Sequence, residues 1–72
     1  MSIHLDEQRL ITARENAGYT NEEIGALLGV RRETVWKWQK GVKSISVQNA
    51  RRLAELLGVK ISELRTELER DT

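Results

Sequence analysis

The sequence predicts an all-α domain of five short helices, and three observations lead to this fold class. The 72 residues include no proline, and residues with high helix propensity dominate. Strict alternation of apolar and polar residues, the signal of a half-buried strand, never continues for more than a few positions. Four glycines each close a helix-like segment, where a left-handed residue is least costly without a Cβ. They are Gly18, Gly29, Gly41 and Gly58.

The length of the chain suffices for one domain. We therefore expect residues 1–72 to form a single domain, with a folded core over about residues 5–70. Residues 1–4 and 71–72 are expected to fray, because nothing in the pattern ties them to the rest of the chain.

An apolar stripe indicates the first helix, and an N-terminal capping motif indicates the second. The first is expected over residues 5–17. Its apolar stripe is Leu10, Ala13 and Ala17. The second is expected over residues 21–28, because Thr20 and Glu23 form a T-x-x-E capping box that satisfies orphan backbone N–H groups. Its expected buried residues are Ile24, Leu27 and Leu28.

The second and third helices form the most informative pair. The third is expected over residues 32–40 with Val35 and Trp38 inward, and only a short Leu-Gly-Val segment separates it from the second. Two helices joined this closely cross at roughly 90–120°. Gly25 supplies the small residue that a close crossing demands, which explains a glycine that costs about 1 kcal/mol in mid-helix.

The fourth helix, residues 47–57, follows the N-cap residue Ser46, and the fifth is expected over residues 61–70. The apolar residues of the fifth are Ile61, Leu64 and Leu68. One interpretation is that they simply close the small core. The other is that Leu64 and Leu68, together with Leu56, pair with a second subunit. We favour a twofold dimer, since small cores are commonly supplemented by oligomerisation.

Composition excludes several function classes. With no cysteine and one histidine, His4, the chain offers no disulfide framework and no zinc-site spacing, so we expect neither metal nor cofactor. No apolar run approaches the roughly 20 residues of a membrane span, and no signal peptide is visible, so a cytoplasmic protein is expected. Neither a nucleophile–base pair nor a phosphate-cradling glycine loop is present, so we expect no enzyme and no small-molecule ligand.

The charge distribution indicates a polyanionic partner. The net charge is only +1, but residues 31–52 hold seven basic residues against Glu33 alone, a net charge of +6. The remainder holds five basic and ten acidic residues, a net charge of −5. The basic residues are Arg31, Arg32, Lys37, Lys40, Lys43, Arg51 and Arg52. A basic middle between acidic ends suggests one face built for a polyanion.

Three stretches carry a resemblance to a known family. They are RENAGYTNEEIGALLGV, VWKWQKG and RRLAELLGVKISEL. Over residues 7–64 the chain resembles the lambda-repressor/Cro-like (XRE-type) helix-turn-helix family. The resemblance implies a five-helix DNA-binding domain in which the second and third helices form the helix-turn-helix. It also implies a transcription regulator, usually dimeric, whose third helix enters the major groove of double-stranded DNA.

The resemblance assigns roles to individual residues. Those matching the family's base-reading positions are Arg32, Glu33 and Lys37. Arg32 and Lys37 can donate hydrogen bonds to the O6 and N7 of guanine, and Glu33 can accept one from the cytosine amino group. For Glu33 a purely structural role remains equally open, since the dipole favours a carboxylate at a helix start. The residues expected to contact phosphates are Asn21, Arg31, Thr34, Lys40 and Lys43.

Trp36 has three interpretations. It points away from Val35 and Trp38. We therefore expect its indole to contact one of three partners: the sugar–phosphate edge, a thymine methyl group or a neighbouring helix. Trp38 is expected in the core.

Four positions depart from the family pattern. Arg31 stands where a serine or threonine usually caps the third helix, and Gln39 replaces the glutamate that pairs with the arginine at Arg14. Here an Arg14–Gln39 hydrogen bond is the most that is expected. Ile45 replaces a common proline, and Gly25 replaces a common alanine.

Three hypotheses about function follow. The favoured hypothesis is a sequence-specific regulator of transcription, a repressor that binds an inverted-repeat operator as a homodimer. The alternative is a protein-interaction module on the same scaffold, such as an antirepressor or an antitoxin-type partner binder, with the acidic first and fifth helices as its contact surface. A third possibility is an architectural factor that reads DNA shape.

Overall fold

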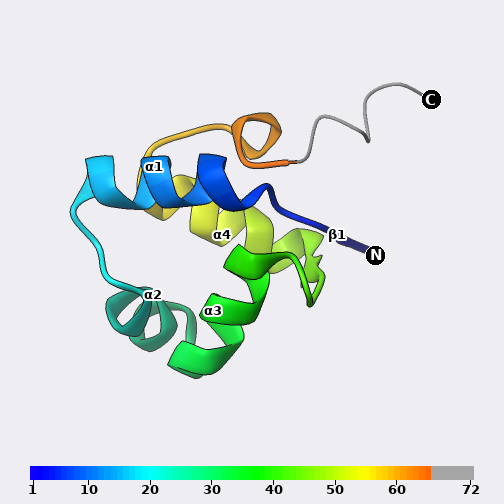
Figure 1. The fold of residues 1–72 in the computed structure, drawn as a ribbon, viewed down its shortest axis with the longest axis horizontal. Coiled ribbons are helices and arrows are strands. Elements are labelled where there is room, and N and C mark those ends of the chain that lie inside the picture. Colours follow the sequence, from blue (N-terminus) through cyan, green and yellow to red (C-terminus); the bar gives the residue numbers. More distant parts are fainter. Residues whose placement is uncertain (66–72) are drawn as a thin grey trace.

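The computed structural model describes residues 1–65, and within that range the chain is mostly helical (Figure 1). Its helices are α1 (Glu7–Ala17), α2 (Asn21–Leu28), α3 (Arg32–Lys40), α4 (Val47–Leu57) and the one-turn 3-10 helix η1 (Ile61–Glu63). Two strands of two residues each, β1 (Ser2–Ile3) and β2 (Ile45–Ser46), pair antiparallel. The first four predicted helices are confirmed to within two residues at each end.

The helix ends follow from the capping residues. In α2, the Thr20 hydroxyl accepts from the backbone N–H of Glu23, and the Glu23 carboxylate accepts from the backbone N–H of Thr20. Ser46 caps α4 through a single hydrogen bond, in which its hydroxyl accepts from the N–H of Asn49. Arg31, the N-cap residue of α3, makes no side-chain cap hydrogen bond, so α3 begins without the usual side-chain support.

The four predicted helix-closing glycines all have a left-handed backbone. Their φ values lie between 73° and 81°, a region that residues with a Cβ rarely adopt, and they are Gly18, Gly29, Gly41 and Gly58. Each therefore ends its helix as the sequence predicts.

The predicted frayed N-terminus is wrong. Ser2 pairs with Ser46 and Ile3 with Ile45, and the N–H of Val47 donates to the carbonyl of Met1 at 3.1 Å. The pairing holds the segment before α1 against β2, which precedes α4. Leu5, which follows β1, is buried in the core.

The predicted fifth helix is also corrected within the described residues. Only Ile61–Glu63 is helical, as a single 3-10 turn, and Arg65 forms an isolated antiparallel bridge with Leu5. The carbonyl of Leu64 accepts from the N–H of Asp6 at 2.8 Å, so the chain extends alongside the N-terminal segment at this point. The rest of the predicted segment, residues 66–70, lies outside the described residues.

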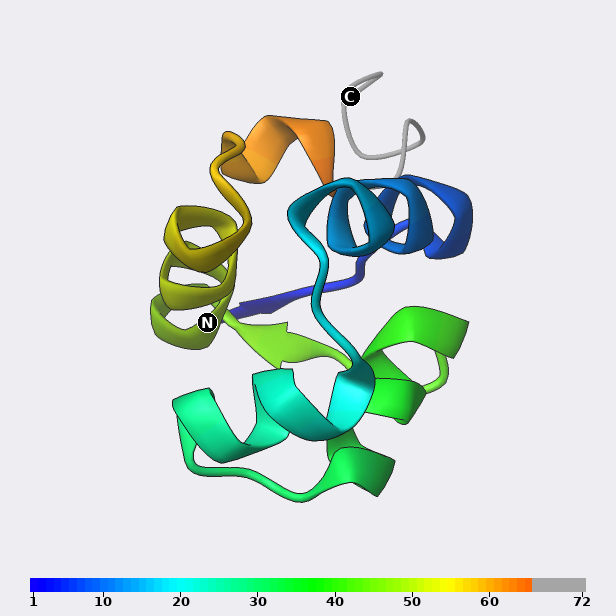
Figure 2. The same ribbon diagram turned by 90° about the vertical axis from the view of Figure 1, so that its left-hand side faces the viewer.

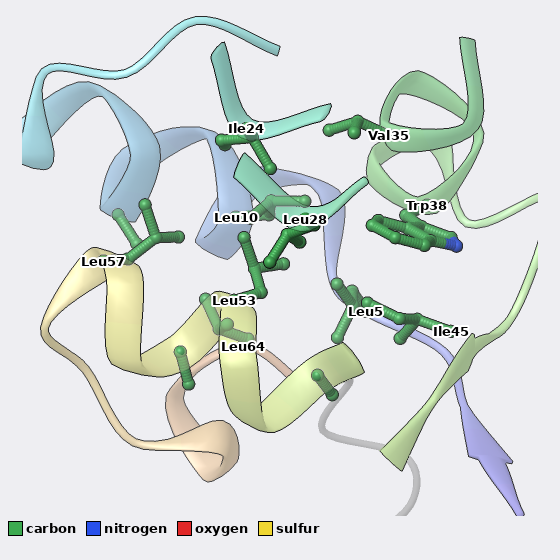
Figure 3. Packing of buried hydrophobic residues seen from close by; sticks show 13 residues of the cluster. Leu5, Leu10, Ile24, Leu28, Val35, Trp38, Ile45, Leu53, Leu57 and Leu64 are labelled. Carbon is green, nitrogen blue, oxygen red and sulfur yellow. The ribbon is translucent and has the colours of Figure 1, made fainter. Parts of the chain in front are cut away.

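Among residues 1–65, thirteen buried apolar residues form one core to which α1, α2, α3 and α4 contribute (Figure 3). Trp38 lies in it with 3% of its surface exposed, as predicted. Leu27 is 55% exposed, so its predicted burial is wrong, and Ala17 is also exposed. Figure 2 shows the resulting arrangement, with α2 and α3 at one end of the molecule and α1 and η1 at the other.

Candidate nucleic-acid interface

The turn between α2 and α3 is packed too closely for any side chain on Gly25. A Cβ at this position would lie 2.7 Å from the carbonyl oxygen of Val30 and 3.3 Å from backbone atoms of Arg31 and Arg32. The N–H of Val30 also donates to the carbonyl of Gly25 at 2.9 Å. The glycine thus fixes the start of α3 against α2, as the sequence predicts.

α3 buries one side and exposes the other. Val35, Trp38 and Gln39 are buried. The three residues that match base-reading positions are exposed, and they are Arg32, Glu33 and Lys37. At 3.6 residues per turn, Glu33 and Lys37 lie one turn apart on the side opposite the buried residues. The helix therefore presents a charged outer face, while Val35 and Trp38 hold it to the core (Figure 3).

One flank of this outer face is a depression of about 420 Å³ between α3 and the segment that leads to α4. Its lining includes Arg31, Thr34 and Lys43, together with the hydroxyl groups of Ser44 and Ser46. Three of the five residues predicted to contact phosphates are therefore brought together here. Cations and hydroxyl groups of this kind are the side chains that bind phosphate oxygens in protein–DNA complexes.

The other flank of the outer face lies towards α1. The Lys40 Nζ lies 3.0 Å from the Glu7 Oε2 and 5.9 Å from the centroid of the Trp36 ring. Lys40, a fourth predicted phosphate contact, thus already has a carboxylate partner. Sequence reasoning missed this pair, because the two residues are 33 positions apart.

Asn21, the fifth predicted phosphate contact, is held by a different interaction. Its Nδ2 donates to the Oε1 of Gln39 at 3.4 Å, and its buried Oδ1 has no hydrogen-bond partner among the described residues. The amide therefore joins the start of α2 to α3.

The expected Arg14–Gln39 hydrogen bond is not the one that forms. The Nη1 of Arg14 donates to the carbonyl of Tyr19 at 2.9 Å, while Gln39 accepts from Asn21. The buried Nε of Arg14 has no hydrogen-bond partner in the described part of the chain. With glutamine in place of glutamate, position 39 carries no charge to attract the guanidinium.

Arg52 has a structural role that the sequence did not reveal. Its guanidinium donates to the carbonyls of Leu27 and Leu28, at 3.5 and 3.4 Å, and to the Oδ1 of Asn49 at 3.3 Å. It therefore satisfies carbonyls at the end of α2 from α4. The neighbouring Arg51 is exposed.

The three residues predicted for a dimer interface differ in their exposure and in whether the structure describes them. Leu64 is fully buried in the core of its own chain, so it has no surface to offer a second subunit, and that prediction is wrong. Leu56 is half-buried and packs against the core. Leu68 lies outside the described residues.

Residues 1–65 contain neither a membrane-spanning helix nor a cluster of metal-ligating side chains. In that part of the chain, no helix has the length and apolar character needed to cross a bilayer. No group of three or more histidine, cysteine, aspartate or glutamate side chains is placed there to hold a metal ion.

A family model and individual relatives both match this chain to helix-turn-helix proteins. The family described as helix-turn-helix matches residues 10–64. Candidate HTH-type transcriptional regulatory proteins of Pyrococcus furiosus and Pyrococcus horikoshii are 37% and 32% identical over 54 residues. That alignment covers 75% of this chain but only 17% of each relative.

The fold is also similar to part of a solved enzyme. A crystal structure described as Fe(II)-HppE with an alternative substrate superposes with a TM-score of 0.71 at 27% identity. The match covers 83% of this chain and 31% of that one.

Proposed function

The chain belongs to the XRE-type helix-turn-helix family, and from this premise we propose that it is a sequence-specific, double-stranded DNA-binding regulator of transcription. The observation that carries the proposal is the outer face of α3. It exposes Arg32, Glu33 and Lys37 while the opposite side of the helix is anchored in the core. The relatives described as candidate transcriptional regulators support the same function.

In the proposed complex α3 lies in the major groove. Arg32 donates two hydrogen bonds to the O6 and N7 of a guanine, and Lys37, five residues further along α3, binds a second acceptor. Glu33 accepts from a cytosine amino group, which compensates for placing a carboxylate among phosphates.

The phosphates are bound on both sides of this face. Arg31, Thr34 and Lys43 bind one strand from the depression beside α3. On the other strand, the first backbone N–H groups of α2, at Asn21, bind a phosphate with the help of the helix dipole. Lys40 contributes less, because Glu7 neutralises it.

We further propose that the regulator is a repressor and binds an inverted repeat as a homodimer. A twofold dimer places two recognition helices about one turn of DNA apart, roughly 34 Å. Leu56, half-buried on α4, is the interface candidate that the described residues retain. The proposal includes no cofactor, no small-molecule ligand and no enzymatic role.

Selection from a pool of random duplex DNA tests the function. The proposal predicts enrichment of one motif, with two half-sites in inverted orientation. Affinity for that motif should fall with salt by about 0.9 log units per log unit of salt for each neutralised phosphate. A pool that yields no motif after repeated rounds would contradict sequence-specific binding.

One observation favours a second candidate, a protein-interaction module. A depression of about 400 Å³ lies between α1 and η1, at the end of the molecule away from α3, and Gln8, Thr12 and Val59 are among its lining residues. A partner bound there in stoichiometric amount and retained after nuclease treatment would support this candidate. Release of the partner by nuclease would show that DNA bridges the two proteins.

A further inference from the structure

α3 exposes one large apolar side chain among its charged ones. Trp36 is 47% exposed, whereas Trp38, two residues later, is buried. Trp36 lies one turn after Arg32 and next to Lys37 in the sequence, so its indole borders the outer face of the helix. The core of the chain therefore leaves about half of the indole accessible to a ligand that approaches this face.

Contacts on one side hold this indole in place. Lys40, one turn further along α3, lies with its Nζ 5.9 Å from the ring centroid. The same Nζ is 3.0 Å from the Glu7 carboxylate of α1, so the cation beside the ring is itself restrained. The indole therefore lies on the flank of α3 that carries Lys40, where the cation–π contact favours this placement of the ring.

We propose that Trp36 is a specificity-determining residue whose indole packs on the C5-methyl group of a thymine in the major groove. The proposal rests on the proposed function and assigns its apolar contact. The C5-methyl is the apolar group that base pairs present in this groove, whereas Arg32 and Lys37 suit polar acceptors. Contact with it removes from water an apolar surface that the folded chain leaves exposed.

The test uses the site recovered by selection, with each thymine replaced in turn by deoxyuridine, which lacks only the methyl group. The unmodified protein should lose about four-fold in affinity at one thymine per half-site, the equivalent of one buried methyl group. The Trp36→Ala variant should bind the thymine site more weakly and be insensitive to the same replacement. Leu27→Ala, which shortens an exposed apolar side chain on α2, is the matched control and should keep the full methyl dependence.

The outcomes separate this inference from the proposed function. An enriched motif whose affinity does not depend on a thymine methyl, or depends on it equally in Trp36→Ala, overturns the role of Trp36 alone. Equal weakening of thymine and deoxyuridine sites by Trp36→Ala shows that the indole contributes without touching the methyl group, and it also overturns the role. Absence of any enriched motif overturns the proposed function as well. Far-UV circular dichroism of each variant verifies that the helices are retained.

Discussion

The Nζ of Lys40 on α3 and the Oε2 of Glu7 on α1 lie 3.0 Å apart, which joins the recognition-helix candidate to the first helix. Both side chains are 42% exposed, so the ion pair contributes at most about 1 kcal/mol to stability. Its larger consequence is electrostatic, because it neutralises a cation beside the outer face of α3.

Replacing Glu7 by glutamine should therefore strengthen DNA binding. The freed Lys40 becomes available to a phosphate, so affinity should rise and the log–log salt slope should steepen by up to about 0.9. Titrations at several salt concentrations measure both. Glu15→Gln makes the same change of net charge at an exposed position of α1. Equal effects of the two substitutions would show that net charge matters and the pair does not.

Arg32→Ala and Lys43→Ala should weaken binding in different ways. Loss of Arg32 should cost about 1–3 kcal/mol on the preferred site and relax the preference at one base pair. Loss of Lys43, which lines the depression beside α3, should weaken all sequences alike and reduce the salt slope by about 0.9. Affinities for the preferred site and its single-base variants distinguish the two. The assignment fails if Arg32→Ala lowers affinity uniformly.

Gly25→Ala should destabilise the fold even though alanine is the better helix former. Propensity alone would stabilise by about 1 kcal/mol. The new Cβ would lie 2.7 Å from the carbonyl oxygen of Val30, a backbone atom, so the turn must shift, at a cost of about 1–3 kcal/mol. Chemical denaturation measures the net loss. A more stable variant would contradict the close approach of Gly25 on α2 to the turn before α3.

Arg52→Met should lower stability by about 1 kcal/mol, because it removes the donor to the last carbonyls of α2. Methionine keeps much of the aliphatic stem, so lost packing contributes little. Arg51→Met, at the adjacent exposed position, is the control and should stay within about 0.5 kcal/mol of the parent. Equal denaturation midpoints for the two variants would refute a capping role for Arg52.

The sequence predicted those parts of the fold that local interactions decide. The Thr20–Glu23 capping box, the helix-closing glycines and the small residue at Gly25 each act within a few positions of one another. Their signals are therefore present in the chain itself. The separation of Trp36 from Trp38 by helical spacing was predictable for the same reason.

The sequence did not predict contacts between distant segments. The pairing of Ser2 with Ser46 involves strands of only two residues, too short to produce a periodic pattern. Likewise, the amide of Asn21 bonds to Gln39 across 18 positions, and no local rule selects that partner. Leu64 fitted both a core position and the favoured interface position, and only the fold shows that it lies inside.

The candidate site shows the same difference between local features, which the sequence predicted, and long-range contacts, which it did not. Arg32, Glu33 and Lys37 were placed on one exposed face by helical spacing and the resemblance, and the structure exposes all three. Lys40 was assigned to a phosphate from the resemblance, and its carboxylate partner on α1 could be found only in three dimensions.

Backbone amide chemical shifts of the isotope-labelled protein, followed while duplex DNA carrying the selected site is added, test the central claim most directly. The largest changes should fall on α3 from Arg32 to Lys37 and on Lys43, with small changes at Gln8 and Val59. Changes concentrated in the depression between α1 and η1, with α3 unaffected, would contradict the claim that the outer face of α3 binds the bases.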